Sequence, residues 1–455
     1  MTPTTADRFL TDFHEVAQIG KTDRGGVERQ AATDADRQTR DWFVAFARER
    51  GWAVEVDRIG NVFARVVLAD RGGASGDAAD ASDASDGEPG SAILSGSHLD
   101  SQPRGGRFDG AYGVIASLHA AAEVERRVRA GELDAIHDLV VVDWFNEEGS
   151  RFAPSIMGSS VYTGLMDCEE ILGVRDLAGT SVREALDGIG YRSESSGPGG
   201  IAGYAEVHIE QGRILEREGI ELGAVDSSWY TQKLDIEVFG EQSHTGATAM
   251  ADRRDALVGA AQIIMLVRDI CREFPDETLV SSVGQMTVEP NSPIVVNSHV
   301  HLVADLRAND PAIVQRARDL LVERFQRVAE DELLEIRATD FDVRPNRYYP
   351  EAGVALQERV AADLGLGIRR MQTMAGHDSV AMNTVAPSVM MFVPSVDGVS
   401  HCEREFTRDE DLVNGLRALT GVLAEMVGGA LDGVSFPGSA PHGDAAAADA
   451  DRGDR

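Results

Sequence analysis

The spacing of apolar residues predicts alternating helices and strands in the first part of the chain. Phe9, Phe13, Val16 and Ile19 recur at helical spacing, which predicts an opening helix. The same period predicts further helices over 34–50, 113–129, 353–363 and 409–427. Strands are expected at 53–57 and 61–69, and short apolar runs of the buried-strand type occur at 93–97, 139–142 and 389–393.

From about residue 220 the pattern changes. Alternating strands at 231–239, 280–288 and 295–306 interleave with helices at 252–273 and 310–329, and a strand at 334–343 ends the block. This β-α-β-β-α-β order is that of a ferredoxin-like unit. Two stretches contain almost nothing apolar and are expected to be disordered, namely an acidic insertion at 70–90 and a tail at 435–455.

Composition excludes several classes of partner. The 455 residues, enough for two or three domains, carry 76 acidic and 43 basic side chains, a net charge of −33. This balance argues against binding to nucleic acid or to an anionic membrane surface. No apolar run approaches the roughly 20 residues that span a bilayer.

The basic residues are almost all arginine, because only Lys21 and Lys233 are lysines. Acid excess with scarce lysine resembles proteins from a high-salt cytoplasm, and it predicts a halophilic protein that needs molar salt. Drift in a GC-rich genome is the alternative explanation. Cys168, Cys271 and Cys402 show no pairing pattern, and the start of the chain lacks a secretory h-region. Both features predict a cytoplasmic location.

Adjacent carboxylates follow the apolar run at 139–142. Glu147 and Glu148 would lie at the end of a buried strand, where open α/β sheets collect their ligands. One carboxylate can bind a metal while its neighbour handles a proton. A solvated acidic loop is the competing interpretation of this segment.

Other strand ends carry the same types of side chain. His98 ends one run, and Asp100, two residues on, is placed to hold its second imidazole nitrogen. Asp109 lies among glycines that let backbone approach closely. His208 and His401 follow two further apolar runs. Each cluster alone is weak, but together imidazoles and carboxylates suit zinc, manganese, cobalt or nickel.

Several motifs together resemble the M20 peptidase group of metal-dependent amidohydrolases, in the hydantoinase/carbamoylase branch. They are GSHLDSQ with GGRFDG, WFNEEGSRF, HIEQG, GEQSHTG, ADLR, AGHDS and the VPS…GVSH run. The branch includes N-carbamoyl-L-amino acid amidohydrolases, allantoate amidohydrolases and β-ureidopropionases, and the resemblance covers about 9 to 426. It implies an α/β catalytic domain with a mixed sheet flanked by helices, plus an inserted ferredoxin-like lid and dimerisation domain. The expected limits are 1–219 and 344–434 for the catalytic domain and 220–343 for the insert, in a homodimer.

The resemblance also implies a two-metal site for a small carbamoyl or ureido substrate. Asp109 would bridge both divalent ions, and Glu147 would be the general base. The remaining metal ligands would be His98 and His208 on one ion, and Glu148 and His401 on the other. On the substrate side, His244 would reach the neighbouring subunit's site and stabilise the oxyanion, and Arg307 would bind the substrate carboxylate. Gln211 and His377 resemble polar residues near the substrate and metals.

Two positions depart from the family pattern. Ile294 stands where the family has a substrate-contacting asparagine, and Met374 replaces a glycine whose backbone would lie close to the substrate. The leading expectation is therefore a hydrolase of linear carbamoyl or ureido amides, with N-carbamoyl-L-amino acids first. Allantoate or β-ureidopropionate is the alternative substrate. A non-catalytic, metal-stabilised binding protein is the alternative of another class, and Glu147 argues against it because structure alone has little need of that side chain.

Overall fold

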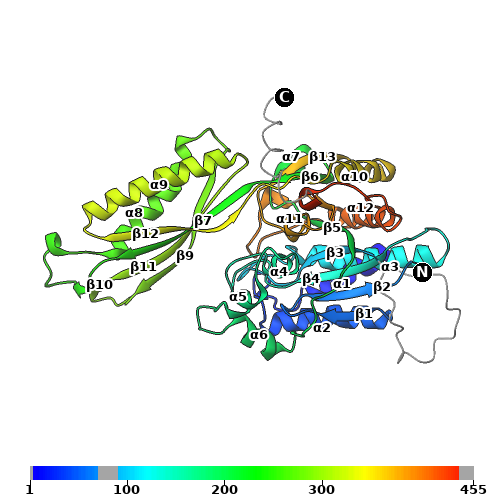
Figure 1. Cartoon of the computed structure of the whole chain (residues 1–455), viewed down its shortest axis with the longest axis horizontal. Helices are drawn as coiled ribbons and strands as arrows, with labels where there is room; N and C mark the ends of the chain where they lie inside the picture. Colours follow the sequence, from blue (N-terminus) through cyan, green and yellow to red (C-terminus); the bar gives the residue numbers. More distant parts are fainter. Residues whose placement is uncertain (1–3, 70–90, 440–455) are drawn as a thin grey trace. The chain divides into compact units, whose positions relative to one another are not determined.

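The computed structural model of the chain describes residues 4–69 and 91–439 (Figure 1). The expected insertion at 70–90 and most of the expected tail lie outside these residues. The chain divides into two compact units. The first runs as far as Asp226 and resumes with Tyr348–Met371 and from Gly376 on, whereas the second comprises Ser227–Arg347 with Gln372–Ala375.

The first unit is built on an eight-stranded mixed sheet in the order β1-β2-β4-β3-β5-β14-β6-β13. Four central strands, β4, β3, β5 and β14, are parallel, and β2 and β6 run antiparallel to their neighbours in this group. Every residue of β4 is buried, as expected for a strand with helices on both faces. The strands are β1 (Ala53–Val56), β2 (Val62–Val66), β3 (Ala92–His98), β4 (Asp138–Trp144), β5 (Ile201–Ile209), β6 (Leu222–Ser228), β13 (Ile368–Thr373) and β14 (Ser388–Val393).

Side-chain alternation along β4 divides the core into two layers. Leu139 and Val141 pack into a large cluster with the long helices, and Val140 and Val142 pack on the opposite face with aromatic side chains. The helices of the first layer are α1 (Thr5–Val16), α2 (Asp34–Glu49), α3 (Ala111–Arg129), α10 (Glu351–Leu364) and α12 (Asp409–Val427). Shorter helices are α4 (Met157–Tyr162), α5 (Cys168–Gly173), α6 (Val182–Ile189), α7 (Ile214–Glu218) and α11 (Asp378–Met382).

The second unit contains a four-stranded antiparallel sheet in the order β12-β7-β11-β9. Two helices pack on one face, because alternate residues such as Val300 and Leu302 of β11 point into a single apolar cluster. A short pair, β8 (Ser243–His244) and β10 (Val295–Val296), forms a separate ribbon. The main elements are β7 (Tyr230–Phe239), α8 (Ala256–Asp269), β9 (Val280–Glu289), β11 (His299–Ala308), α9 (Pro311–Asp331) and β12 (Glu335–Arg344).

The expected fold class is confirmed: a mixed sheet flanked by helices, and a ferredoxin-like unit of the predicted order. Residues 220–226 belong with the first unit, because β6 pairs with β14 in the eight-stranded sheet. The strand predicted at 295–306 is divided into β10 and β11. The helix predicted from 252 begins at Ala256, because the Asp255 side chain accepts a hydrogen bond from the backbone N–H of Leu257 and caps it there.

Cys168, Cys271 and Cys402 are free cysteines, each partly exposed. Over 4–69 and 91–439, no helix combines the length and the apolar character that a membrane span requires.

Candidate metal centre

Four parallel strands bring the predicted ligands to one edge of the sheet. His98 is the last residue of β3, and His208 lies one residue before the end of β5. Glu147 and Glu148 follow β4, and His401 follows the turn after β14. Because the carboxyl ends of adjacent parallel strands meet at one edge, residues far apart in the sequence come together there.

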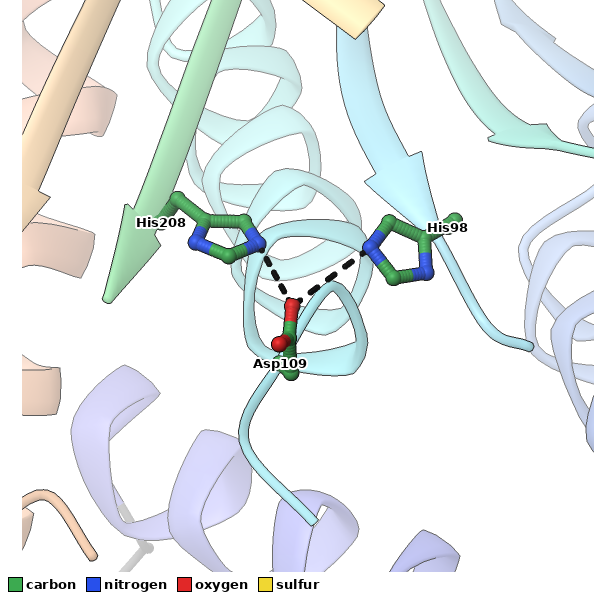
Figure 2. Close-up of side chains that lie close together, drawn as sticks. All are labelled: His98, Asp109 and His208. Carbon is green, nitrogen blue, oxygen red and sulfur yellow. Dashed lines mark ion pairs between the residues drawn. The ribbon is translucent and has the colours of Figure 1, made fainter. Parts of the chain in front are cut away.

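One carboxylate oxygen of Asp109 faces two imidazoles. Its Oδ1 lies 3.0 Å from Nε2 of His208 and 3.6 Å from Nε2 of His98, and both rings point at it in Figure 2. The donor atoms of these three residues lie within 4.8 Å of one another. All three side chains are buried.

The other oxygen of Asp109 faces a second group. Its Oδ2 lies 3.3 Å from Nε2 of His401, which is 3.4 Å from Oε2 of Glu148. These donor atoms also fall within 4.8 Å of one another. Asp109 therefore offers one oxygen to each of two donor sets.

The pKa values of the three carboxyl groups at this edge of the sheet are shifted from their usual range. Burial favours the neutral acid, yet hydrogen bonds from imidazoles, that of His208 first, hold the pKa of Asp109 well below its usual range. Burial raises the pKa of Glu147 well above its usual value, although the charge of His98 opposes the rise. Burial, with the charge of Asp109 next, also raises the pKa of Glu148.

This donor set fits divalent cations. Carboxylates withdrawn from water are costly unless opposite charge compensates them, and here Asp109, Glu147 and Glu148 lie within one small region. Imidazole nitrogen and carboxylate oxygen are ligands of zinc, manganese, cobalt and nickel. The arrangement suits two such ions, one on each side of Asp109.

Backbone carbonyls orient the two buried histidines. Nδ1 of His98 lies 2.9 Å from the carbonyl oxygen of Asp100, and Nδ1 of His208 lies 2.9 Å from that of Ile209. With its proton on Nδ1, each ring donates to the carbonyl and keeps the Nε2 lone pair for a ligand.

The carboxylate of Asp100 contacts His98, as expected, and a second group. Its Oδ1 lies 3.5 Å from Nδ1 of His98, whereas the carbonyl oxygen of Asp100 lies 2.9 Å from the same nitrogen. The same Oδ1 accepts a hydrogen bond from the backbone N–H of Glu147 at 3.1 Å. Asp100 thus holds His98 through its carbonyl and its carboxylate, and the same carboxylate holds the backbone of Glu147.

Two polar side chains that sequence reasoning did not assign also hold this centre. Gln102 donates from its backbone N–H and its side-chain amide to the carboxylate of Glu148, at 3.1 and 2.9 Å. Buried Glu405 accepts the backbone N–H groups of Phe108 and Asp109, each at 3.1 Å. Gln102 ends the GSHLDSQ motif, and Glu405 follows shortly after the VPS…GVSH run. A glutamine and a glutamate at these positions gave no signal of the contacts that they make.

The expected substrate-side residues of the first unit lie beside the centre. Gln211 donates to Oδ2 of Asp109 at 2.7 Å, and Ser400 donates to the same oxygen at 3.0 Å. The ring of His377 packs edge-on against His208, with centroids 4.6 Å apart. Both Gln211 and His377 therefore touch a proposed metal ligand directly.

His244 and Arg307 belong to the second unit. Nδ1 of the exposed His244 accepts the backbone N–H groups of Gly246 and Ala247, at 2.9 and 3.1 Å. The guanidinium of Arg307 pairs with Asp305 at 2.6 Å and donates to the carbonyl of Met374 at 2.9 Å.

Comparison with known proteins agrees with the motifs. The model of peptidase family M20/M25/M40 matches residues 94–425. A protein of Mycolicibacterium smegmatis described only as a hydrolase is 48% identical, over 93% of this chain and 94% of its own. An N-carbamoyl-L-amino-acid amidohydrolase of Rhizobium meliloti is 33% identical over 88% and 91%, and an allantoate amidohydrolase of Bacillus subtilis is 31% identical over 92% and 97%.

The fold comparison points to the same branch. The crystal structure of an amidase of the hydantoinase/carbamoylase family from Burkholderia vietnamiensis matches with a TM-score of 0.83 at 36% identity. The match covers 92% of this chain and 97% of that one. With most of the chain matched in sequence and in fold, the protein belongs to peptidase family M20/M25/M40, in its hydantoinase/carbamoylase branch of amidases.

Proposed function

We propose that this metal-dependent amidohydrolase uses two divalent ions to cleave a linear carbamoyl or ureido amide, with N-carbamoyl-L-amino acids as first candidates. The observation that carries the proposal is Asp109, whose two oxygens face separate imidazole-containing donor sets. In this assignment His98 and His208 hold one ion, and Glu148 and His401 hold the other. Zinc, manganese, cobalt and nickel all suit these ligands.

Glu147 is the proposed general base. When bound, a pair of divalent ions supplies Lewis acidity that activates a water and polarises the scissile carbonyl. Oε2 of Glu147 lies 3.4 Å from Nε2 of His98, so the carboxylate borders the ligand cluster. Burial raises its pKa, which lets it take a proton from water and hold it until the leaving nitrogen needs it.

The proposed substrate contacts come from the second unit. A bidentate guanidinium suits a substrate carboxylate, and Arg307 is already aligned by Asp305. A neutral His244 whose Nδ1 accepts two N–H groups carries its proton on Nε2, which supplies the donor that an oxyanion requires. We further propose a cytoplasmic homodimer in which His244 serves the neighbouring subunit, and sedimentation at several concentrations would test the dimer.

Both departures from the family pattern lie against these contacts. The carbonyl of Ile294 accepts the hydroxyl of Thr245, next to His244, and the carbonyl of Met374 accepts Arg307. The side chains of Ile294 and Met374 are exposed, so these two substitutions can change the surface that a substrate contacts. This observation, together with the allantoate amidohydrolase relative, supports allantoate or β-ureidopropionate as the second candidate substrate.

Ammonia release tests the proposal. Full-length protein loaded with Mn²⁺, Co²⁺ or Zn²⁺ is incubated with N-carbamoyl-L-amino acids, β-ureidopropionate and allantoate. Release from the first group, lost with chelator and in Glu147→Gln, is the expected result. Release from allantoate or β-ureidopropionate alone would replace the first candidate with the second. No ammonia release from any substrate, with two metal ions bound per chain, would overturn the carbamoyl assignment and favour a binding role.

A further inference from the structure

A third group of side chains that can bind metal lies on the second unit, whereas the residues of the metal centre belong to the first. Helices α8 and α9 pack on one face of its four-stranded sheet (Figure 1). Successive strand residues point to opposite faces, so the alternate residues of β7 and β11 are turned from that core. On this open face β7 contributes Asp235 and Glu237, and β11 contributes His299 and His301.

The register of the two strands brings three donors together. Asp235 and Glu237 are two residues apart on β7, and His301 is the direct cross-strand partner of Glu237. Directly opposed side chains in an antiparallel pair are close neighbours. The donor atoms of these three residues lie within 4.8 Å of one another, with His301 Nε2 at 2.9 Å from Oδ1 of Asp235.

A fourth donor adjoins the group. Nε2 of His299 hydrogen-bonds Glu237, and its ring stacks on Phe239 with centroids 4.9 Å apart. The stacking restrains the ring on the side of β7. His299 lies two residues before His301 on the same face of β11. Its contact with Glu237 places it where it can approach an ion that Glu237 holds.

Nearby cations are paired with other carboxylates. Arg337, opposite Glu237 on β12, pairs with Glu335 and stacks over Phe239. Lys233 pairs with Asp342 at 2.7 Å. Both positive charges are thus engaged by carboxylates outside the group of Asp235, Glu237 and His301.

We propose that Asp235, Glu237 and His301 form a surface site for a divalent transition-metal ion of the zinc class. Ligands of a tetrahedral zinc ion lie about 2 Å from the metal and so roughly 3.3 Å from one another, close to the His301–Asp235 spacing. All three donors stand on paired central strands, so little backbone order has to be gained on binding. Water or His299 completes the coordination.

The competing interpretation is a set of ion pairs between histidines and acids. Such a pair needs one carboxylate for each imidazole and gives no special role to a third donor. His14 supplies the matched control, since it pairs with Asp409 at 3.3 Å on the surface of the first unit and is not part of a three-donor group among the described residues. Its side chain is more exposed than that of His301.

Metal counting distinguishes these interpretations. Full-length wild type, His301→Ala, Asp235→Asn and His14→Ala are equilibrated at one buffered free Zn²⁺ concentration, and bound zinc is measured per chain. We expect His301→Ala and Asp235→Asn each to bind one equivalent less than wild type, and His14→Ala to bind the same amount. The result is a difference between variants, so it does not depend on how many ions the metal centre holds.

Two controls keep the result decisive. Circular dichroism and thermal unfolding check that each variant is folded, and two different substitutions guard against failure of one. A Co²⁺ titration supplies a second readout. The visible absorption bands of the additional ion should appear in wild type and be missing from both His301→Ala and Asp235→Asn. Equal zinc content in wild type and both site variants would overturn the proposal, as would an equal loss in His14→Ala.

Discussion

At the scale of single residues, the neighbours Glu147 and Glu148 have different surroundings. Glu148 receives two hydrogen bonds from Gln102 and faces His401, which fixes its carboxylate toward the second donor set. Glu147 is held by its backbone N–H to Asp100, and its carboxylate faces His98. The restrained carboxylate suits a ligand, and the less restrained one suits a group that moves a proton.

Replacing Glu147 with Gln should separate these roles. We expect kcat to fall by roughly 10²–10⁴-fold, because proton transfer is removed. Metal content and unfolding temperature should stay near those of wild type, since the amide fills the same space. The matched variant Glu148→Gln should instead lose metal. Activity of Glu147→Gln close to wild type would refute the assignment of the base.

Asp57 should make stability depend on pH. Burial raises the pKa of its carboxyl to about 7 in the folded protein, against about 4 in an unfolded chain. The folded state therefore binds more protons between these values, and this group lowers the free energy of unfolding as pH rises from about 4 to about 7, by about 4 kcal/mol in full. Asp57→Asn cannot titrate.

Urea unfolding of wild type and Asp57→Asn at both ends of this window checks the sign. We expect the stability of wild type minus that of the variant to become smaller as pH rises. Any constant effect of the substitution on the hydrogen bonds with Asn61 cancels in this comparison. Parallel stability curves for the two proteins would contradict the raised pKa.

At the scale of elements, the turn before α3 determines how Asp109 is presented. Glu405 anchors its backbone, and Gly110 follows with φ of 61° and ψ of −50°. A Cβ at Gly110 would lie 2.3 Å from Nε2 of His98. The glycine therefore allows the helix to begin directly against a proposed ligand.

Gly110→Ala should displace the His98 ring and lose metal from the first donor set. Gly131→Ala is the matched control, because it also has positive φ but a Cβ there meets nothing within 4 Å. Both variants place alanine at positive φ, where an L side chain is strained. Only Gly110→Ala should lower metal content and activity, measured by metal analysis and ammonia release. Equal losses would mean that backbone strain, not the collision, decides.

At the scale of the whole molecule, the net charge of −33 opposes compaction. Many arginines are paired with acids at the surface, as Arg370 is with Glu351 and Glu358. These local pairs leave the excess of acidic charge in place. Screening should therefore stabilise the fold, because the Debye length falls from about 10 Å at 0.1 M salt to about 3 Å at 1 M.

Raising salt from about 0.1 M to about 1 M should increase both the unfolding temperature and activity of the metal-loaded protein. Potassium chloride and potassium glutamate compared at equal ionic strength provide the control. If screening is responsible, the two salts should act alike. Full activity and unchanged unfolding temperature after dialysis to low salt would refute the halophilic expectation.

Much of the fold followed from local pattern. The apolar period predicted the long helices, several strands of the large sheet and the β-α-β-β-α-β unit, because helices and strands bury side chains at different spacings. Boundaries at 252 and 295–306 differed from the structure, since a cap at Asp255 and the division of one strand into β10 and β11 depend on particular contacts.

The sequence by itself determined the chemical types at the metal centre and the family, because those are carried by residue identity and motif. Only tertiary structure decided which atoms meet. Asp100 uses its carbonyl toward His98, and Glu405 reaches back almost three hundred positions to hold Asp109. The His301 group likewise exists only through the register of β7 and β11. These contacts are set by the pairing of strands and by the way the chain re-enters the first unit after the second. Local hydrophobic spacing encodes neither.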